Sequence, residues 1–159
     1  MAVTTTTYSA AQTVTMTNTS LTNGSWRQST AVDNGTNKYI DAHLGGSIQV
    51  GTTPTAGGTI DVYAYGTYDG TNFTAGASGT DGSYTADGEE GLLKFVTSIA
   101  VDATSDQDYV FGPESIAAAF GGVLPETWGI VIENNTGATL NATGTNNEIQ
   151  FFGITFATA

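Results

Sequence analysis

Apolar and polar positions alternate with a period of two over the first long hydrophobic stretch of the chain. From Ile40 to Val50 every even position is apolar or glycine, and polar side chains such as Asp41 and Gln49 occupy odd positions. The alternation returns over residues 60–67 after a break rich in Gly, Pro and Thr. A period of two is typical of strands with one buried and one solvated face. The pattern therefore predicts two strands in the middle of an antiparallel β-sandwich.

Shorter stretches with the same character predict further strands. They are residues 12–18, 25–32, 92–101, 106–111, 127–133, 139–142 and 148–157. We expect 92–101 to be a central strand and the last strand to turn Phe152, Ile154 and Phe156 toward the core. Residues 70–91 are rich in Gly, Ser, Thr and Asp, which predicts a long surface loop.

One segment predicts a helix. Residues 114–120 are Ala-rich, begin with Glu114 and are followed by two glycines, which is typical of a helix end. A helix of about two turns is not stable alone, so Ile116 and Phe120 should pack on the sandwich.

Eight or nine short strands with one short helix at about 114–120 predict an all-β fold, an antiparallel β-sandwich that is jelly-roll-like. An immunoglobulin-like sandwich is the alternative. The length of 159 residues favours one domain, which we place at residues 24–159. Residues 1–23 are Thr-rich and uncharged, and they predict a flexible N-terminal arm. The alternative for the arm is an extended segment that adds a strand to a neighbouring subunit.

Charge excludes several classes of partner. The net charge is −12, and the bases are Arg27, Lys38 and Lys94. Nucleic acid and anionic membranes need clustered Lys and Arg, so we expect neither as a partner. The N-terminus has no basic region followed by an apolar core, which predicts synthesis and folding in the cytoplasm of the producing cell.

No set of residues predicts catalysis, so we expect a protein that is not an enzyme and binds no cofactor. The chain has no cysteine, and His43 is its one histidine. Acids gather at residues 102–108 and 81–90, where calcium is one interpretation, but the spacing of a calcium-binding loop is absent and solvated loop acids are the simpler one. No pair of carboxylates is singled out for glycoside hydrolysis, and the glycines lack the context of a phosphate-binding loop.

Tyrosines suggest a contact surface. Tyr63 and Tyr65 fall on the predicted solvent face of their strand, and Tyr39 has the same parity in the neighbouring strand. Cross-strand tyrosine pairs on a half-exposed sheet are one interpretation. A protein–protein contact and a carbohydrate platform are the others.

Several segments taken in order resemble a family of capsid decoration (cement) proteins of tailed bacteriophages and prophages. The resemblance covers roughly residues 25–159 and rests on the segments 27–34, 38–41, 53–57, 60–66, 101–106, 120–125, 128–129 and 135–142. It implies a non-enzymatic protein on the outside of the virion capsid, made in the host bacterial cytoplasm. It also implies binding to the major capsid protein and self-association, often as a trimer.

The resemblance leads to a hypothesis about contacts. Large amphipathic residues and arginine are favoured at interfaces, so Trp26, Arg27, Lys38 and Tyr39 are contact candidates beside Tyr63 and Tyr65. The arm is a further candidate for contact with the shell. The rival hypothesis is a carbohydrate-binding β-sandwich for host adhesion, which would use the exposed tyrosines and the loop acids.

Overall fold

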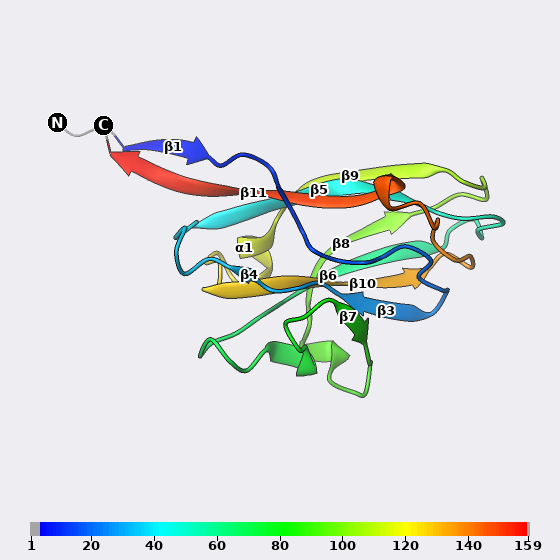
Figure 1. The fold of residues 1–159 in the computed structure, drawn as a ribbon, viewed down its shortest axis with the longest axis horizontal. Helices are drawn as coiled ribbons and strands as arrows, with labels where there is room; N and C mark the ends of the chain where they lie inside the picture. Colours follow the sequence, from blue (N-terminus) through cyan, green and yellow to red (C-terminus); the bar gives the residue numbers. More distant parts are fainter. Residues whose placement is uncertain (1–3, 159) are drawn as a thin grey trace.

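Two antiparallel sheets pack face to face in the computed structural model, which describes residues 4–158 (Figure 1). The first sheet contains, in spatial order, β1 (Thr4–Tyr8) with β2 (Gln12–Thr13), then β11 (Asn147–Thr158), β5 (Asp41–Gln49) and β9 (Asp108–Ser115). The second sheet contains β7 (Gly82–Tyr84), β3 (Ser25–Gln28), β10 (Thr127–Asn135), β6 (Thr59–Gly66) and β8 (Lys94–Ala100), with β4 (Val32–Asp33) also paired to β10.

The strand order is that of a jelly roll. If β1 with β2 and β3 with β4 each count as one strand, and β7 is set aside, eight strands remain. The first, eighth, third and sixth form one sheet, and the second, seventh, fourth and fifth form the other. This order confirms the predicted jelly-roll sandwich over the immunoglobulin-like alternative. The eleven strands exceed the predicted eight or nine because two strands are interrupted and β7 is added.

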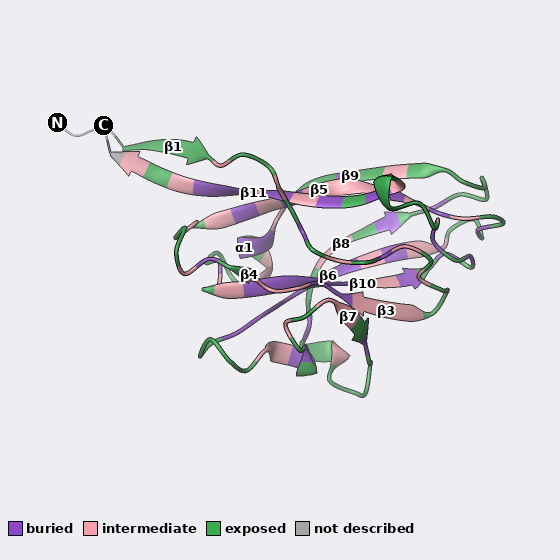
Figure 2. Ribbon diagram, in the orientation of Figure 1, coloured by how far each residue is buried: buried purple, intermediate pink, exposed green. Residues whose placement is uncertain are grey.

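The core between the sheets follows the predicted alternation. Leu44 and Ile48 of β5 and Ile60 and Val62 of β6 are fully buried. The predicted inward set of β10 is also buried, and the ring centroid of Trp128 lies 5.2 Å from that of Phe151. In Figure 2 buried residues follow the middle of both sheets.

The last strand corrects a prediction. Phe152, Ile154 and Phe156 were expected to face the core, but β11 turns Ile149 and Phe151 into it instead, and of the expected three only Ile154 is buried. Both faces of this strand are apolar, so the sequence leaves the register open by one residue, and a slip of one exchanges the faces. Phe156 is 62% exposed as a result.

Strand β8 corrects a second prediction, because it is an edge strand and not a central one. It pairs only with β6, and the register shifts between Val62 and Tyr63. This bulge places Ile99 in the core but leaves Phe95 57% exposed. β9 also extends past Gly112 and Pro113, where the sequence predicted its end.

The N-terminal segment lies along the first sheet. β1 and β2 both pair with β11, and β2 covers only part of the strand predicted at 12–18. Val14 is 3% exposed in the core and Asn18 is buried too. Strand pairing with the sandwich therefore begins at Thr4 and buried packing at about residue 14, rather than at residue 24.

Residues 68–93 form a cover for the second sheet, where a surface loop was predicted. They contain the 3-10 turns η1 (Thr74–Gly76) and η2 (Glu90–Leu92) and the strand β7. Ala75, Ala77, Tyr84 and Leu93 pack with residues of the sheet into a second, smaller core. Figure 1 shows this segment below the second sheet, on the side away from the first.

The remaining elements are short. Helix α1 (Ile116–Ala119) begins at Ser115, whose hydroxyl accepts a hydrogen bond from the Ala118 amide, and Ile116 and Phe120 pack on the core as predicted. The strand predicted at 139–142 is reduced to one bridge between Leu140 and Val50, followed by the 3-10 turn η3 (Gly144–Asn146).

The register of β11 leads to a stability prediction. Phe151→Ala should lower the free energy of unfolding by about 3–5 kcal/mol, because it leaves a cavity beside Trp128. Phe156→Ala should cost less than about 1 kcal/mol, because most of this ring already contacts solvent. Urea unfolding of both variants measures the difference, and equal losses would contradict the observed register.

Candidate functional site

Four of the six predicted contact residues lie on β3 and β6 of the second sheet. Tyr63 and Tyr65 lie on its outer face, as the alternation predicted, and Trp26 shares that face. That face is covered by residues 68–93, so the three rings belong to or pack on the second core. The prediction of a solvated tyrosine face is therefore wrong for this sheet.

Tyr65 is fully buried. Its ring lies over Gly129, where a side chain would collide with it, and its hydroxyl donates a hydrogen bond to the Ser29 carbonyl at 2.6 Å. Burial raises the pKa of Tyr65 to about 12, partly offset by this hydrogen bond. Tyr65 is thus a structural residue.

Trp26 and Tyr63 form an aromatic pair at the rim of the cover. Their ring centroids lie 5.5 Å apart with the planes at 28°, and Tyr84 lies 5.9 Å from Trp26. Both Trp26 and Tyr63 remain half-buried. The contact of Trp26 with Tyr84 of β7 attaches the cover to the sheet.

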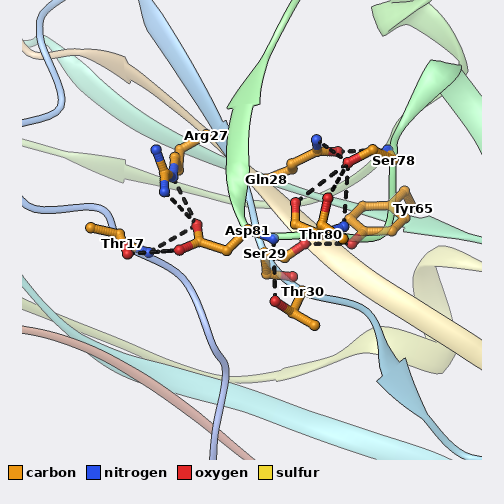
Figure 3. Close-up of polar contacts among 9 residues, drawn as sticks. All are labelled: Thr17, Arg27, Gln28, Ser29, Thr30, Tyr65, Ser78, Thr80 and Asp81. Atoms are coloured by element: carbon orange, nitrogen blue, oxygen red, sulfur yellow. Dashed lines mark hydrogen bonds and ion pairs between the residues drawn. The ribbon is translucent and has the colours of Figure 1, made fainter.

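Arg27 joins three parts of the chain through Asp81 (Figure 3). The Arg27 Nε and Nη2 atoms both lie 2.8 Å from Asp81 Oδ1. Asp81 also accepts hydrogen bonds from the amide and the hydroxyl of Thr17. The pair therefore ties the N-terminal segment and the cover to β3, and Arg27 is not a free contact residue.

Amide and hydroxyl groups continue this network toward Tyr65 (Figure 3). Gln28 donates to the Ser78 hydroxyl and accepts from the Ser78 amide, and the Thr30 hydroxyl accepts from the Asp81 amide. The cover is thus held by polar contacts at its edge and by apolar packing at its centre.

The other two predicted residues lie at the opposite end of the sandwich. Tyr39 packs over Gly153, and its hydroxyl accepts a hydrogen bond from Gln12 Nε2 at 3.1 Å. The Lys38 side chain is 72% exposed, and its Nζ lies 3.8 Å from Glu126 Oε1. The structure therefore does not bring the six candidates together into one surface.

The acidic clusters do not converge on a metal site. Within residues 4–158, no group of three or more His, Asp or Glu side chains is placed to hold a metal ion. Asp102 instead accepts hydrogen bonds from the Thr104 amide and the Tyr109 hydroxyl, and these bonds lower the pKa of Asp102. None of the helices in this part of the chain is long and apolar enough to cross a membrane.

The sequence analysis missed a projecting element at the free end of the first sheet. We define the terminal ribbon as β1 together with residues 154–158 of β11. β5 ends its pairing with β11 at Ile154, so only β1 continues alongside β11 (Figure 1). Within residues 4–158, no strand pairs with the outer edge of β1 or with the opposite edge of residues 155–158.

The terminal ribbon is uncharged in a strongly acidic chain. No charged side chain occurs before Arg27 or after Glu148. Thr7 and Thr155 share a hydroxyl hydrogen bond of 2.6 Å across the ribbon. The sequence shows two uncharged, β-prone ends, which could have suggested this element. That the two ends pair with each other is visible only in the structure.

The surface of the described residues contains hollows that could hold a ligand. A groove of about 560 Å³ runs between residues 17–27 and 83–86 and is lined mainly by hydroxyl side chains with Trp26 and Tyr84. A hollow of about 410 Å³ lies on the outer face of the first sheet, between His43, Pro113 and Phe152.

No family model, no curated protein and no solved structure matches this chain.

The contacts of Asp81 predict that the link between the N-terminal segment, the cover and β3 weakens in acid. Burial alone would raise its pKa, but hydrogen bonds from Thr17 and Arg27 together with the Arg27 charge outweigh burial and lower it. Because the pKa is lower in the folded chain, this stabilisation is present above the ordinary Asp value of about 3.9 and is lost as pH falls through the folded pKa. Asp81→Asn should lower the free energy of unfolding at neutral pH by about 2 kcal/mol.

The difference between wild type and Asp81→Asn should shrink in acid, which urea unfolding at several pH values measures. Asp87→Asn is the matched control, because Asp87 is an exposed acid of the same segment. If the difference in unfolding free energy stays constant down to the lowest pH, the ionised Asp81 carboxylate does not stabilise the fold. The same conclusion follows if Asp87→Asn loses as much stability as Asp81→Asn.

Proposed function

We propose that this chain is a structural virion protein that decorates the outer surface of a tailed-phage capsid and stabilises the shell. The family resemblance of residues 25–159 suggests this function. The observation that carries the proposal is the terminal ribbon, an uncharged pair of strands with two open edges at one end of an acidic body.

Open edges favour the addition of a strand. Natural proteins blunt exposed edges with charges, prolines or bulges, because an unpaired row of amides and carbonyls pairs with other chains. The terminal ribbon has neither charge nor proline. An extended segment of the major capsid protein could therefore pair with β1, with main-chain hydrogen bonds supplying the affinity.

The charge distribution supports attachment through this end. Copies with a net charge of −12 repel one another at low salt. Many acidic copies can pack on a shell most easily if the contact surface contains no carboxylate that must be desolvated. Arg27 is already paired with Asp81, so the body offers little positive charge for an acidic partner.

The jelly-roll fold is compatible with a capsid decoration protein but is not by itself evidence for one. Jelly rolls occur in viral capsid proteins and in lectins, and one fold serves many functions. The resemblance implies a self-associating protein on the capsid exterior that is not an enzyme and is made in the host cytoplasm. These remain predictions.

A carbohydrate-binding module for host adhesion is the second candidate, and the groove beside β7 favours it. Seven Ser and Thr side chains line this groove with Trp26 and Tyr84, and hydroxyls beside aromatic rings suit neutral sugars. A glycan array with and without EDTA distinguishes the two: sugar binding without capsid binding would favour this candidate.

The alternation of hydrogen bonds in the ribbon provides a test of the first proposal. The Ser9 amide donates to the Gly153 carbonyl, so in this antiparallel register Thr5 and Thr7 bond to β11. The amides of Thr4, Thr6 and Tyr8 then point toward the free edge. Thr6→Pro removes one outward amide without removing a bond to β11.

Thr6→Pro should weaken binding to expanded capsids by roughly tenfold or more, because a central hydrogen bond of the added strand is lost and the ring obstructs its approach. Co-sedimentation of the protein with purified capsids measures the affinity.

Thr6→Ala is the matched control. It removes the same side chain but keeps the amide, and it should bind nearly as wild type. Binding of Thr6→Pro that equals that of Thr6→Ala would count against attachment through the edge of β1, and no binding of wild type to capsids would refute the proposed function.

A further inference from the structure

An apolar stripe runs along the outer face of the first sheet. Tyr8 and Phe156 of the terminal ribbon are 65% and 62% exposed, and both share this face with Phe152. Phe152 contacts Tyr8 edge-on at 5.7 Å and His43 at 5.3 Å between ring centroids. The stripe therefore connects the ribbon to the hollow beside His43.

The hollow is lined partly by residues without side chains. Gly45, Gly46 and Gly112 lie there, beside Pro113 and Phe152. These glycines are required by close strand contact: a side chain at Gly112, whose φ is +87°, would collide with the Leu44 carbonyl. The sheet itself therefore shapes the hollow.

The stripe offers no uncompensated charge at its centre. Asp41 lies beside His43 with its Oδ2 at 3.3 Å from Nε2, but its carboxylate also accepts hydrogen bonds from the Ser115 hydroxyl and the Ala117 amide. Glu148 stands at the edge of the hollow and accepts from Gln150 at 2.6 Å. Contact at the centre thus buries apolar surface without burying a free carboxylate.

We propose that this face binds a second copy of the chain, with Tyr8 and Phe156 of each copy placed over the hollow of the other. The inference rests on the proposed function only for its setting, because self-association can be measured without a capsid. Such patches of exposed aromatic residues mark interaction sites in soluble proteins.

The arrangement of the stripe favours a second copy over another partner. The projecting rings and the hollow lie on one face of one chain, and Phe156 follows Phe152 by four residues, or about 13 Å along a strand. Two copies placed face to face about a two-fold axis satisfy both contacts at once. The Asp41 carboxylate on this face already accepts hydrogen bonds from Ser115 and Ala117, which limits repulsion between the two stripes.

Phe156→Ser should raise the dimer dissociation constant by roughly tenfold or more, because it removes a central aromatic contact. Sedimentation equilibrium at high salt, which screens the −12 net charge, measures the association. Phe95→Ser is the matched control, because Phe95 has the same side chain and is 57% exposed on the other sheet. It should leave the dissociation constant unchanged.

A second variant tests the hollow. Gln150→Glu keeps the size of the side chain but adds a carboxylate beside Glu148, and it should weaken association by a similar factor. Gln107→Glu adds the same charge at an exposed position outside the stripe and should not. Circular dichroism confirms that each variant is folded.

Several results would overturn the inference. They are a monomer at every concentration in high salt, a trimer, or an equal effect of Phe156→Ser and Phe95→Ser. A trimer would instead agree with the trimeric self-association that the resemblance suggests. If no dimer forms but dilute protein binds capsids in a way that depends on the Thr6 amide, the proposed function stands and the dimer is refuted. If a dimer forms but the protein does not bind capsids, the dimer stands and the proposed function is refuted.

Discussion

The packing of residues 68–93 onto the outer face of the second sheet determines which surface of the sandwich stays open. Tyr65, Tyr84 and Val131 are buried there, and the Arg27–Asp81 pair holds the edge of the cover. Within residues 4–158 the first sheet has no such cover, and its outer face carries Tyr8 and Phe152. The apolar face proposed for self-association follows from that asymmetry.

The charged residues are also distributed unevenly over the molecule. The acids lie between residues 33 and 148, whereas both ends of the chain are uncharged and pair with each other in the terminal ribbon. An acidic body keeps copies soluble and apart, and an uncharged end allows contact without the cost of desolvating carboxylates. The edge of the ribbon and its apolar face are distinct surfaces, so strand addition and self-association do not compete for the same atoms.

The sequence alone predicted the buried face of a strand correctly where the other face is clearly polar. β5 and β10 follow the predicted alternation, and the jelly-roll order agrees with the predicted architecture. In β11 both faces are apolar, so Phe151 and Phe152 could not be told apart by period alone. Tyr65 was misplaced because the segment that buries it is rich in Gly and Asp and predicts a loop, and its few apolar residues reveal a core only once the chain has folded back.

Hydrogen exchange of the terminal ribbon on and off the capsid tests the central claim most directly. In the free protein the outward amides of Thr4, Thr6 and Tyr8 should exchange rapidly, because no described strand pairs with this edge of β1. On expanded capsids they should become protected as a strand of the shell pairs with them. Rapid exchange of these amides in protein that is fully capsid-bound would contradict attachment through the ribbon.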